Sequence, residues 1–182
     1  MQPTLVTAMH ALHSPNRRHL LTTCLAMLAP TALLAQTPPK PVSPAAELEG
    51  ITPDGQRIEL AALRDRVVLV YYWSTQCPVC LNKMPELRAN VAGWRGEAFT
   101  LLGVNMDESQ EAFASYENLV QPLVAAELRF SSVWGRDPAY RDNLGQVTHL
   151  PTTLLVDKRG QVVDRFAGRI PPSAWNRIAD LL

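Results

Sequence analysis

Residues 67–73, VVLVYYW, form an unbroken apolar run, which is the pattern of a strand buried on both faces. A second buried strand is predicted at residues 99–106. Two further strands are predicted at residues 152–156 and 162–166, and the segment DKRGQ joins them as a turn. Four strands therefore account for the most apolar parts of the chain after residue 66.

Between these strands the apolar residues recur every three or four positions, which predicts helices. The clearest stripe consists of Leu81, Met84, Leu87, Val91 and Trp94. A second helix is predicted from residue 109 to about 120, and a third over residues 171–182, started by its prolines. The elements follow the order βαβα and then ββα.

Before this core, residues 47–51 and 56–60 flank the sequence TPDG, which predicts a β-hairpin. Further upstream, residues 1–35 predict a secretory signal peptide, because Arg17 and Arg18 precede a short apolar run. That run is short for a bilayer span and contains a proline, so a retained membrane anchor is the weaker alternative. The adjacent arginines leave the general and the twin-arginine export routes open.

Cleavage of the predicted signal after residue 35 would also remove Cys24. Residues 36–45, rich in proline, are predicted to form a disordered linker, and residues 46–182 a single domain. The mature chain then keeps only Cys77 and Cys80. A disulfide across two intervening residues closes a small loop and adds little to the stability of the fold. The pair is therefore explained better by a chemical function than by a structural one.

The charge balance argues against two classes of binding partner. Seventeen basic residues match 17 acidic ones, so the chain has no net field to hold nucleic acid or an anionic membrane. With 182 residues, 47% of them hydrophobic, the chain can build a core without metal or disulfide staples, and no cofactor is predicted.

The two cysteines lie where the first buried strand gives way to a helix. Pro78 fits the first helical position, where its missing N–H costs nothing, and Cys77 is then the N-cap. The free amides and the positive end of the helix dipole favour a thiolate at Cys77, which makes it the nucleophile. Cys80, one turn later, resolves the mixed disulfide.

A structural zinc site is the main alternative for the pair. It requires four ligands, and the mature chain adds only His149 and no second C-x-x-C. The strand-to-helix context favours redox chemistry, and no metal site is predicted.

The segment YYWSTQCPVCLNKMPEL resembles the active-site motif of the thioredoxin superfamily, specifically its exported TlpA/ResA-like branch. HLPTTLLVDKRGQVV and LGVNMDESQEAF resemble two further segments of that branch, in the expected order. The resemblance covers residues 45 to 182 and implies a thioredoxin-like α/β fold. In such a fold a central mixed β-sheet is flanked by helices, here with an N-terminal β-hairpin extension.

The resemblance also implies roles for several residues. Pro151 would be a cis-proline facing the thiols, and it would turn the Leu150 backbone outward to pair with an extended substrate. Trp73, Gln76 and Pro78 would complete the substrate-binding surface around the cysteines.

The chain departs from the family pattern at two positions. Gln76 replaces an aromatic residue before the first cysteine, and Tyr71 stands where cytoplasmic thioredoxins carry a buried carboxylate. Proton transfer then needs another group, and Glu108 is the candidate by resemblance. The alternative interpretation of Glu108 is an exposed acid at the start of a helix.

The direction of electron flow is predicted from the two residues between the cysteines. Pro78 and Val79 bring neither a charge nor a side-chain donor, so the thiolate is less stabilised than in strong oxidants. We therefore expect a periplasmic reductant of disulfides in exported proteins, such as apocytochrome c or copper-site proteins. A membrane electron donor of the CcdA/DsbD type would recharge it.

Two alternatives remain. A Sco-like copper metallochaperone would bind copper through Cys77, Cys80 and His149, although its cysteines are usually spaced more widely. A cytochrome-maturation thioredoxin of the CcmG type would carry Gly-Ala-Pro-Glu, whereas this chain reads HLPTT.

Overall fold

The computed structural model describes residues 44–182. The predicted signal peptide, Cys24 within it and residues 36–43 of the predicted linker lie outside these residues. In the part described, no helix is both long and apolar enough to cross a membrane.

The central sheet has five strands in the order β5-β4-β3-β7-β8. They are β3 (Val67–Trp73), β4 (Phe99–Asn105), β5 (Ser131–Trp134), β7 (Thr152–Val156) and β8 (Val162–Ala167). β3 pairs in parallel with β4 and antiparallel with β7, so the sheet is mixed, as predicted. Every residue of β3 and β7 is buried, because both strands lie inside the sheet with both faces covered.

The predicted N-terminal hairpin is also confirmed. β1 (Leu48–Ile51) pairs antiparallel with β2 (Arg57–Glu59), and Gly55 supplies the positive φ of 85° that the turn needs. The sequence did not predict β6 (Arg141–Asp142), which pairs with the other side of β1 and makes a three-stranded sheet, nor β5 at the edge of the central sheet.

Within residues 44–182 three α-helices accompany the sheets: α1 (Pro78–Gly93), α2 (Gln110–Val120) and α3 (Ser173–Ala179). Helix α1 continues through Pro85. Short 3₁₀ helices lie at η1 (Leu60–Leu63), η2 (Gln121–Leu123) and η3 (Ala126–Leu128).

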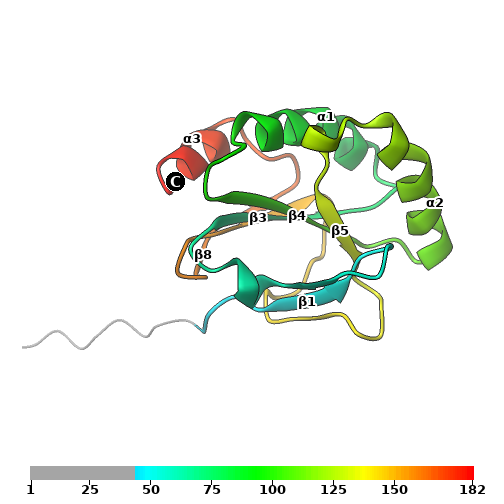
Figure 1. Cartoon of the computed structure of the whole chain (residues 1–182). Helices are drawn as coiled ribbons and strands as arrows, with labels where there is room; N and C mark the ends of the chain where they lie inside the picture. Colours follow the sequence, from blue (N-terminus) through cyan, green and yellow to red (C-terminus); the bar gives the residue numbers. More distant parts are fainter. Residues whose placement is uncertain (1–43) are drawn as a thin grey trace, which may run out of the picture. The chain divides into compact units, whose positions relative to one another are not determined.

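The alternation of side chains along β3 divides the interior into two cores. The odd-numbered residues of β3 pack with buried side chains of the three α-helices, among them Cys80, Met84 and Leu87 of α1. The even-numbered residues pack with Leu48 of β1, Leu60 and their neighbours. Figure 1 shows the result: α1 and α3 cover one face of the central sheet, and the sheet that contains β1 lies on the other.

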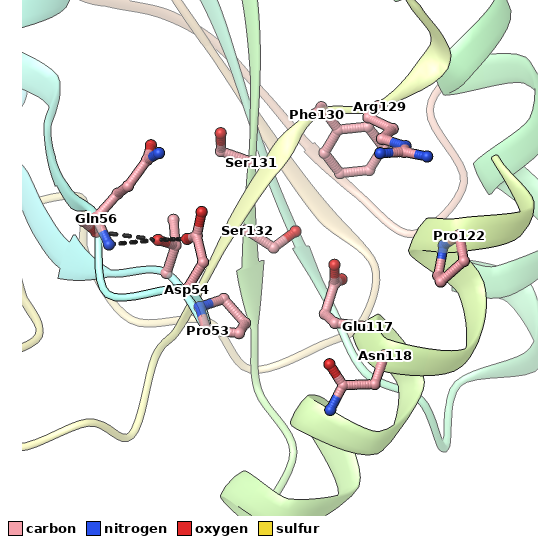
Figure 2. Close-up of a pocket in the computed structure, with 11 residues that line it drawn as sticks. Pro53, Asp54, Gln56, Glu117, Asn118, Pro122, Arg129, Phe130, Ser131 and Ser132 are labelled. Carbon is pink, nitrogen blue, oxygen red and sulfur yellow. Dashed lines mark hydrogen bonds between the residues drawn. The ribbon is translucent and has the colours of Figure 1, made fainter. Parts of the chain in front are cut away.

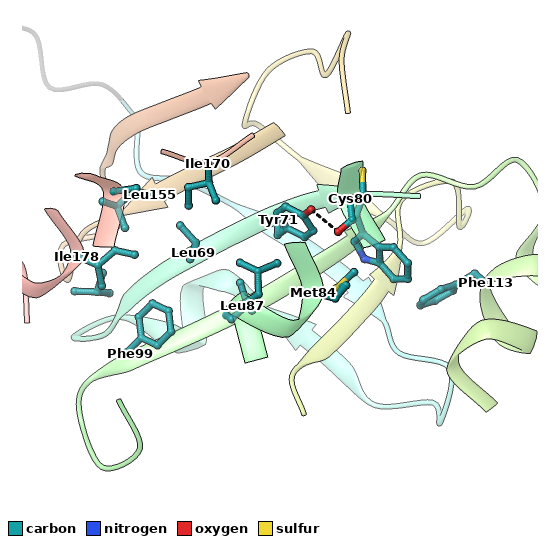
Figure 3. Close-up of a cluster of buried hydrophobic side chains, with 14 residues drawn as sticks. Leu69, Tyr71, Cys80, Met84, Leu87, Phe99, Phe113, Leu155, Ile170 and Ile178 are labelled. Carbon is teal, nitrogen blue, oxygen red and sulfur yellow. Dashed lines mark hydrogen bonds between the residues drawn. The ribbon is translucent and has the colours of Figure 1, made fainter. Parts of the chain in front are cut away.

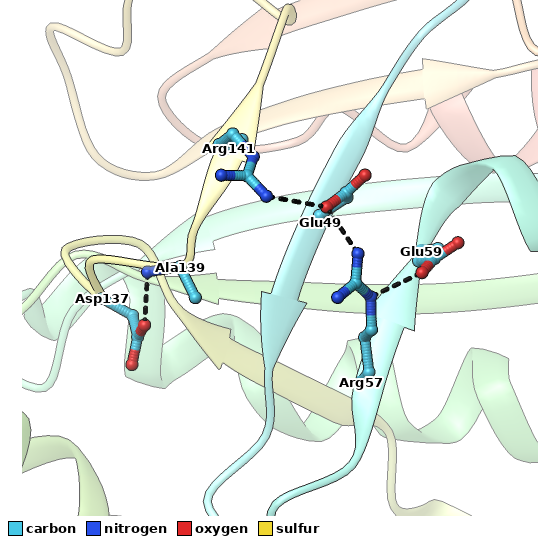
Figure 4. A network of polar contacts seen from close by, with 6 residues as sticks. All are labelled: Glu49, Arg57, Glu59, Asp137, Ala139 and Arg141. Carbon is cyan, nitrogen blue, oxygen red and sulfur yellow. Dashed lines mark hydrogen bonds and ion pairs between the residues drawn. The ribbon is translucent and has the colours of Figure 1, made fainter.

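Exposed ion pairs follow the small sheet (Figure 4). Glu49 of β1 lies 2.9 Å from Arg57 of β2 and 3.4 Å from Arg141 of β6, and Arg57 also contacts Glu59 at 2.5 Å. Because all four side chains are at least 38% exposed, these pairs add little to stability.

Candidate active site

The cysteines lie where the sequence placed them. β3 ends at Trp73, a short turn follows, and α1 begins at Pro78 with Cys77 as its N-cap. Cys77 has an extended backbone, with φ −105° and ψ 98°, and its Sγ accepts a hydrogen bond from the backbone N–H of Cys80 at 3.1 Å. The predicted contact between the Cys77 sulfur and the helix N-terminus is therefore confirmed.

The two sulfurs form a disulfide, with the Cα atoms 5.2 Å apart. Cys77 is half-buried, whereas Cys80 is fully buried in the core beneath α1. An incoming thiolate or disulfide can therefore reach only the Cys77 sulfur. This asymmetry suits a nucleophile and a shielded resolving thiol.

The chain neighbours of Cys77 are uncharged. Pro78 is exposed and Val79 is 41% exposed, while Gln76 is an exposed neighbour on the other side of Cys77. The only hydrogen bond to the Cys77 sulfur within the described residues is the one from the Cys80 amide. In the part of the chain that the structure describes, the sulfur therefore has one backbone donor and no hydrogen bond from a charged side chain.

Pro151 follows a cis peptide bond, as predicted. The next residue, Thr152, pairs with Tyr72, so Pro151 lies at the end of the sheet from which Cys77 emerges. Pro151 O accepts a hydrogen bond from Gly168 N at 2.7 Å. Within residues 44–182 no hydrogen bond uses the amide or carbonyl of Leu150, and its pairing with an extended substrate stays a prediction.

Trp73 is a core residue, only 1% exposed. Its ring packs against Tyr116 at 5.0 Å and against Phe113 at 6.1 Å between centroids, both on α2. The structure thus gives Trp73 a packing role between the end of β3 and α2. Its contact with substrate stays a prediction.

Tyr71 lies directly beneath the first turn of α1 (Figure 3). Its hydroxyl donates a hydrogen bond to Cys80 O at 3.1 Å. Burial, reinforced by nearby Tyr116, raises the pKa of Tyr71 well above its usual range. The hydroxyl therefore stays protonated and anchors the helix, and it cannot accept a proton from a thiol.

The two acidic residues after β4 have different surroundings. Glu108 is exposed, and no hydrogen bond or ion pair joins it to another described residue. Its part in proton transfer stays a prediction. Asp107 is 3% exposed, and its carboxylate contacts the turn that carries Cys77. The sequence offered one signal for Asp107, a charged residue just past a buried strand.

The copper alternative gains no support. His149 is exposed, and its ring nitrogen Nδ1 lies 2.9 Å from Thr148 Oγ1. Across residues 44–182, no cluster of three or more His, Cys, Asp or Glu side chains is arranged to hold a metal ion.

A surface pocket of about 580 Å³ lies away from the thiols (Figure 2). It is bordered by the β1–β2 turn, the end of α2 and the start of β5. Its polar lining includes Asp54, Gln56, Asn118, Arg129 and Ser131. None of the predicted site residues lines this pocket.

Comparison with known proteins agrees with this geometry. The AhpC/TSA family profile matches residues 41–165. Thiol-disulfide oxidoreductase ResA of Bacillus subtilis (strain 168) is 27% identical over 129 residues, covering 71% of this chain and 68% of that protein. Thiol:disulfide interchange protein DsbE of Yersinia pestis is 29% identical over 150 residues, covering 81% and 73%.

Solved structures confirm the predicted thioredoxin-like fold. A thiol:disulfide interchange protein of the thioredoxin family from Chlorobium tepidum TLS has a TM-score of 0.59 at 21% identity, covering 76% of this chain and 94% of the other. A DsbF homologue from Corynebacterium diphtheriae has a TM-score of 0.59 at 18% identity, covering 77% and 87%.

Proposed function

Because this chain belongs to the AhpC/TSA family, within the thioredoxin superfamily, and carries a C-P-V-C disulfide, we propose that it is a thiol-disulfide oxidoreductase that reduces disulfides of exported proteins. The observation that carries the proposal is the asymmetry of the pair. Cys77 is partly accessible at the N-terminus of α1, whereas Cys80 is fully buried one turn further along the helix.

The reaction is a two-electron exchange. The Cys77 thiolate attacks one sulfur of the target disulfide, that bond breaks, and the released target thiolate takes up a proton. Cys80 then loses its proton and attacks the Cys77 sulfur, and the second target thiolate leaves and is protonated. The target gains two electrons and two protons, and this chain ends in the disulfide form seen here.

The surroundings of the Cys77 sulfur support the proposed reductive direction. Its stabilisation comes from one amide and the helix N-terminus, because Pro78 and Val79 add no charge. A thiolate with little stabilisation gives up electrons more readily than one paired with a cation.

Substrate, export and electron supply are parts of the same proposal. The N-terminal residues 1–35 have the composition of a signal peptide, and the substrates are exported proteins such as apocytochrome c or copper-site proteins. Outside the cytoplasm thiols are kept oxidised, so the protein needs a donor, for which a membrane carrier of the CcdA/DsbD type fits.

Equilibration with glutathione tests the direction. We expect a potential well below the roughly −120 mV of DsbA, within or below the span of about −180 to −270 mV of isomerases and thioredoxin. Separating reduced from oxidised protein after acid quenching gives the ratio. A value at the oxidant end contradicts the reductive function and leaves oxidoreductase chemistry standing.

A further inference from the structure

Asp107 is a buried acid that is hydrogen-bonded directly to the turn of residues 74–77, which leads into Cys77 and is called the redox turn below. It lies two residues after the end of β4 and is 3% exposed. One carboxylate oxygen accepts hydrogen bonds from Ser74 Oγ at 2.5 Å and from Thr75 N at 2.9 Å. The other accepts a hydrogen bond from Asn105 Nδ2 at 3.1 Å.

All three partners act as donors. The amide of Thr75 and the side-chain NH₂ of Asn105 can only donate. The Ser74 hydroxyl already accepts a hydrogen bond from Gln76 N at 3.0 Å, so its own proton points to Asp107. The site is therefore built for the acceptor-only carboxylate form, and no cation among the described residues pairs with it.

These contacts reach Cys77 through the turn. Ser74 O accepts a hydrogen bond from Cys77 N at 3.2 Å, and Ser74 Oγ accepts one from the amide of Gln76. The conformation of residues 74–77 decides where the Cys77 sulfur stands relative to the Cys80 amide, 3.1 Å away. A carboxylate that fixes two of the four turn residues therefore fixes the N-cap geometry as well.

Asp107 is itself held from the neighbouring strands. Its carbonyl accepts a hydrogen bond from Trp134 Nε1 of β5 at 2.8 Å, and its amide donates to Asn105 Oδ1 at 3.0 Å. The preceding amide, Met106 N, donates to Trp73 O at 2.7 Å. The main chain of residues 105–107 is thus held by β3, β4 and β5, and the Asp107 carboxylate extends from it to the turn that carries Cys77.

We propose that Asp107 is a positioning residue of the thiol pair, which holds the Ser74–Cys77 turn so that the Cys77 sulfur stays at the N-terminus of α1. The proposal rests on the redox activity of the pair and not on the direction of electron flow. The substrate does not have to touch Asp107, because the residue acts through the main chain of the turn.

A positioning role and a purely electrostatic role of Asp107 predict opposite effects on the stability of the Cys77 thiolate, so the proposal can be tested. If Asp107 acts by position, its loss misaligns the Cys77 sulfur from the helix amides, and the thiolate becomes less stable. If Asp107 acts only as a nearby negative charge, its loss removes a repulsion, and the thiolate becomes more stable.

The test compares Asp107→Asn, Ser74→Ala and the double variant with the parent full-length chain. Reduced protein is alkylated with iodoacetamide from pH 5 to 9, and the thiol-disulfide equilibrium with glutathione is measured in parallel. Asp157→Asn is the matched control. Asp157 is a similarly buried turn carboxylate, 7% exposed, at the opposite end of the sheet.

We expect Asp107→Asn to slow Cys77 alkylation at pH 7 by about threefold or more and to move the alkylation midpoint to higher pH, with a parallel shift in the glutathione equilibrium. Ser74→Ala should show a smaller change in the same direction. The double variant should show less than the combined effect, because both residues serve one network.

Faster alkylation in Asp107→Asn, or a profile unchanged like that of Asp157→Asn, overturns the proposal. If Asp107→Asn does not fold, Ser74→Ala decides by the same two readouts. Failure of the reductive function would appear as an oxidant-like potential in the parent protein, whereas failure of the positioning role would appear as equal values in parent and variants.

Discussion

The two ends of the central sheet each contain a turn organised by a buried aspartate. At the thiol end, Asp107 accepts hydrogen bonds from Ser74, Thr75 and Asn105. At the opposite end, Asp157 closes the turn between β7 and β8. It accepts hydrogen bonds from Arg159 N at 2.9 Å and Gln161 N at 2.8 Å.

The partners of the two carboxylates differ in range and charge. Those of Asp157 lie within four residues and include the Arg159 guanidinium at 3.1 Å, so the turn is local and ion-paired. Ser74 and Thr75 are more than 30 residues from Asp107 and carry no charge. A local turn stabilises its own hairpin, whereas a long-range one fixes two loops against each other, which is what a reactive group needs.

The largest expected difference between the two ends of the sheet is in reactivity, and substitution of the cysteines at the thiol end tests it. Cys80→Ser should accumulate mixed disulfides between Cys77 and its targets, because no second thiol can release them, while Cys77→Ser should form none. Non-reducing gels and mass spectrometry of the trapped species would name the substrates. Equal trapping by both variants would contradict the assignment of Cys77 as the nucleophile.

Local sequence patterns predicted much of this architecture. β3 and β7 were predicted to the residue because the apolar run VVLVYYW and the β-branched and apolar run TTLLV identify them without reference to a partner strand. β5, with the sequence SSVW, and β6, with RD, are too short and polar for that. They become strands only by pairing with β4 and β1, which lie more than 25 residues away in the chain.

The site divides in the same way. Cys77 as N-cap follows from Pro78 and the strand before it, and the cis bond at Pro151 was implied by the family motif. Which of two adjacent acids turns inward was not predictable, because the inward place of Asp107 depends on donors contributed by the β3–α1 turn. Sequence resemblance pointed to Glu108 instead.

The pH dependence of unfolding should show what Asp157 contributes at its end of the sheet. Burial tends to raise the pKa of Asp157, but the backbone amide of Gln161 and the contacts of Arg159 outweigh it and hold the pKa below its usual value. A carboxylate with a lowered folded-state pKa stabilises the fold above the unfolded pKa of about 3.9, and this contribution disappears as the pH falls through the folded-state value.

Asp157→Asn should therefore lose about 1–2 kcal/mol of unfolding free energy at pH 7, and this deficit should shrink as the pH falls below about 4. Urea unfolding at pH 7, 5, 4 and 3 measures it, with glutathione exchange at pH 7 expected to match the parent. A deficit that stays constant across this range would show that the charge of Asp157 is not its source.

The smallest expected effect is at Glu108, beside Asp107 and yet exposed. If it takes the Cys80 proton, as the resemblance implies, Glu108→Gln should slow reduction of a model disulfide by about twofold, since a solvated acid contributes less than a desolvated one. The thermal midpoint should not change, because the structure gives this side chain no hydrogen bond to another described residue.

Stopped-flow reduction from pH 6 to 9, with exposed Glu111→Gln of α2 as control, measures the difference. A rate and pH profile equal to those of the control would remove Glu108 from the mechanism and leave solvent as the acceptor of the Cys80 proton. The contrast between adjacent residues would then be complete, with Asp107 acting through the turn and Glu108 only on the surface.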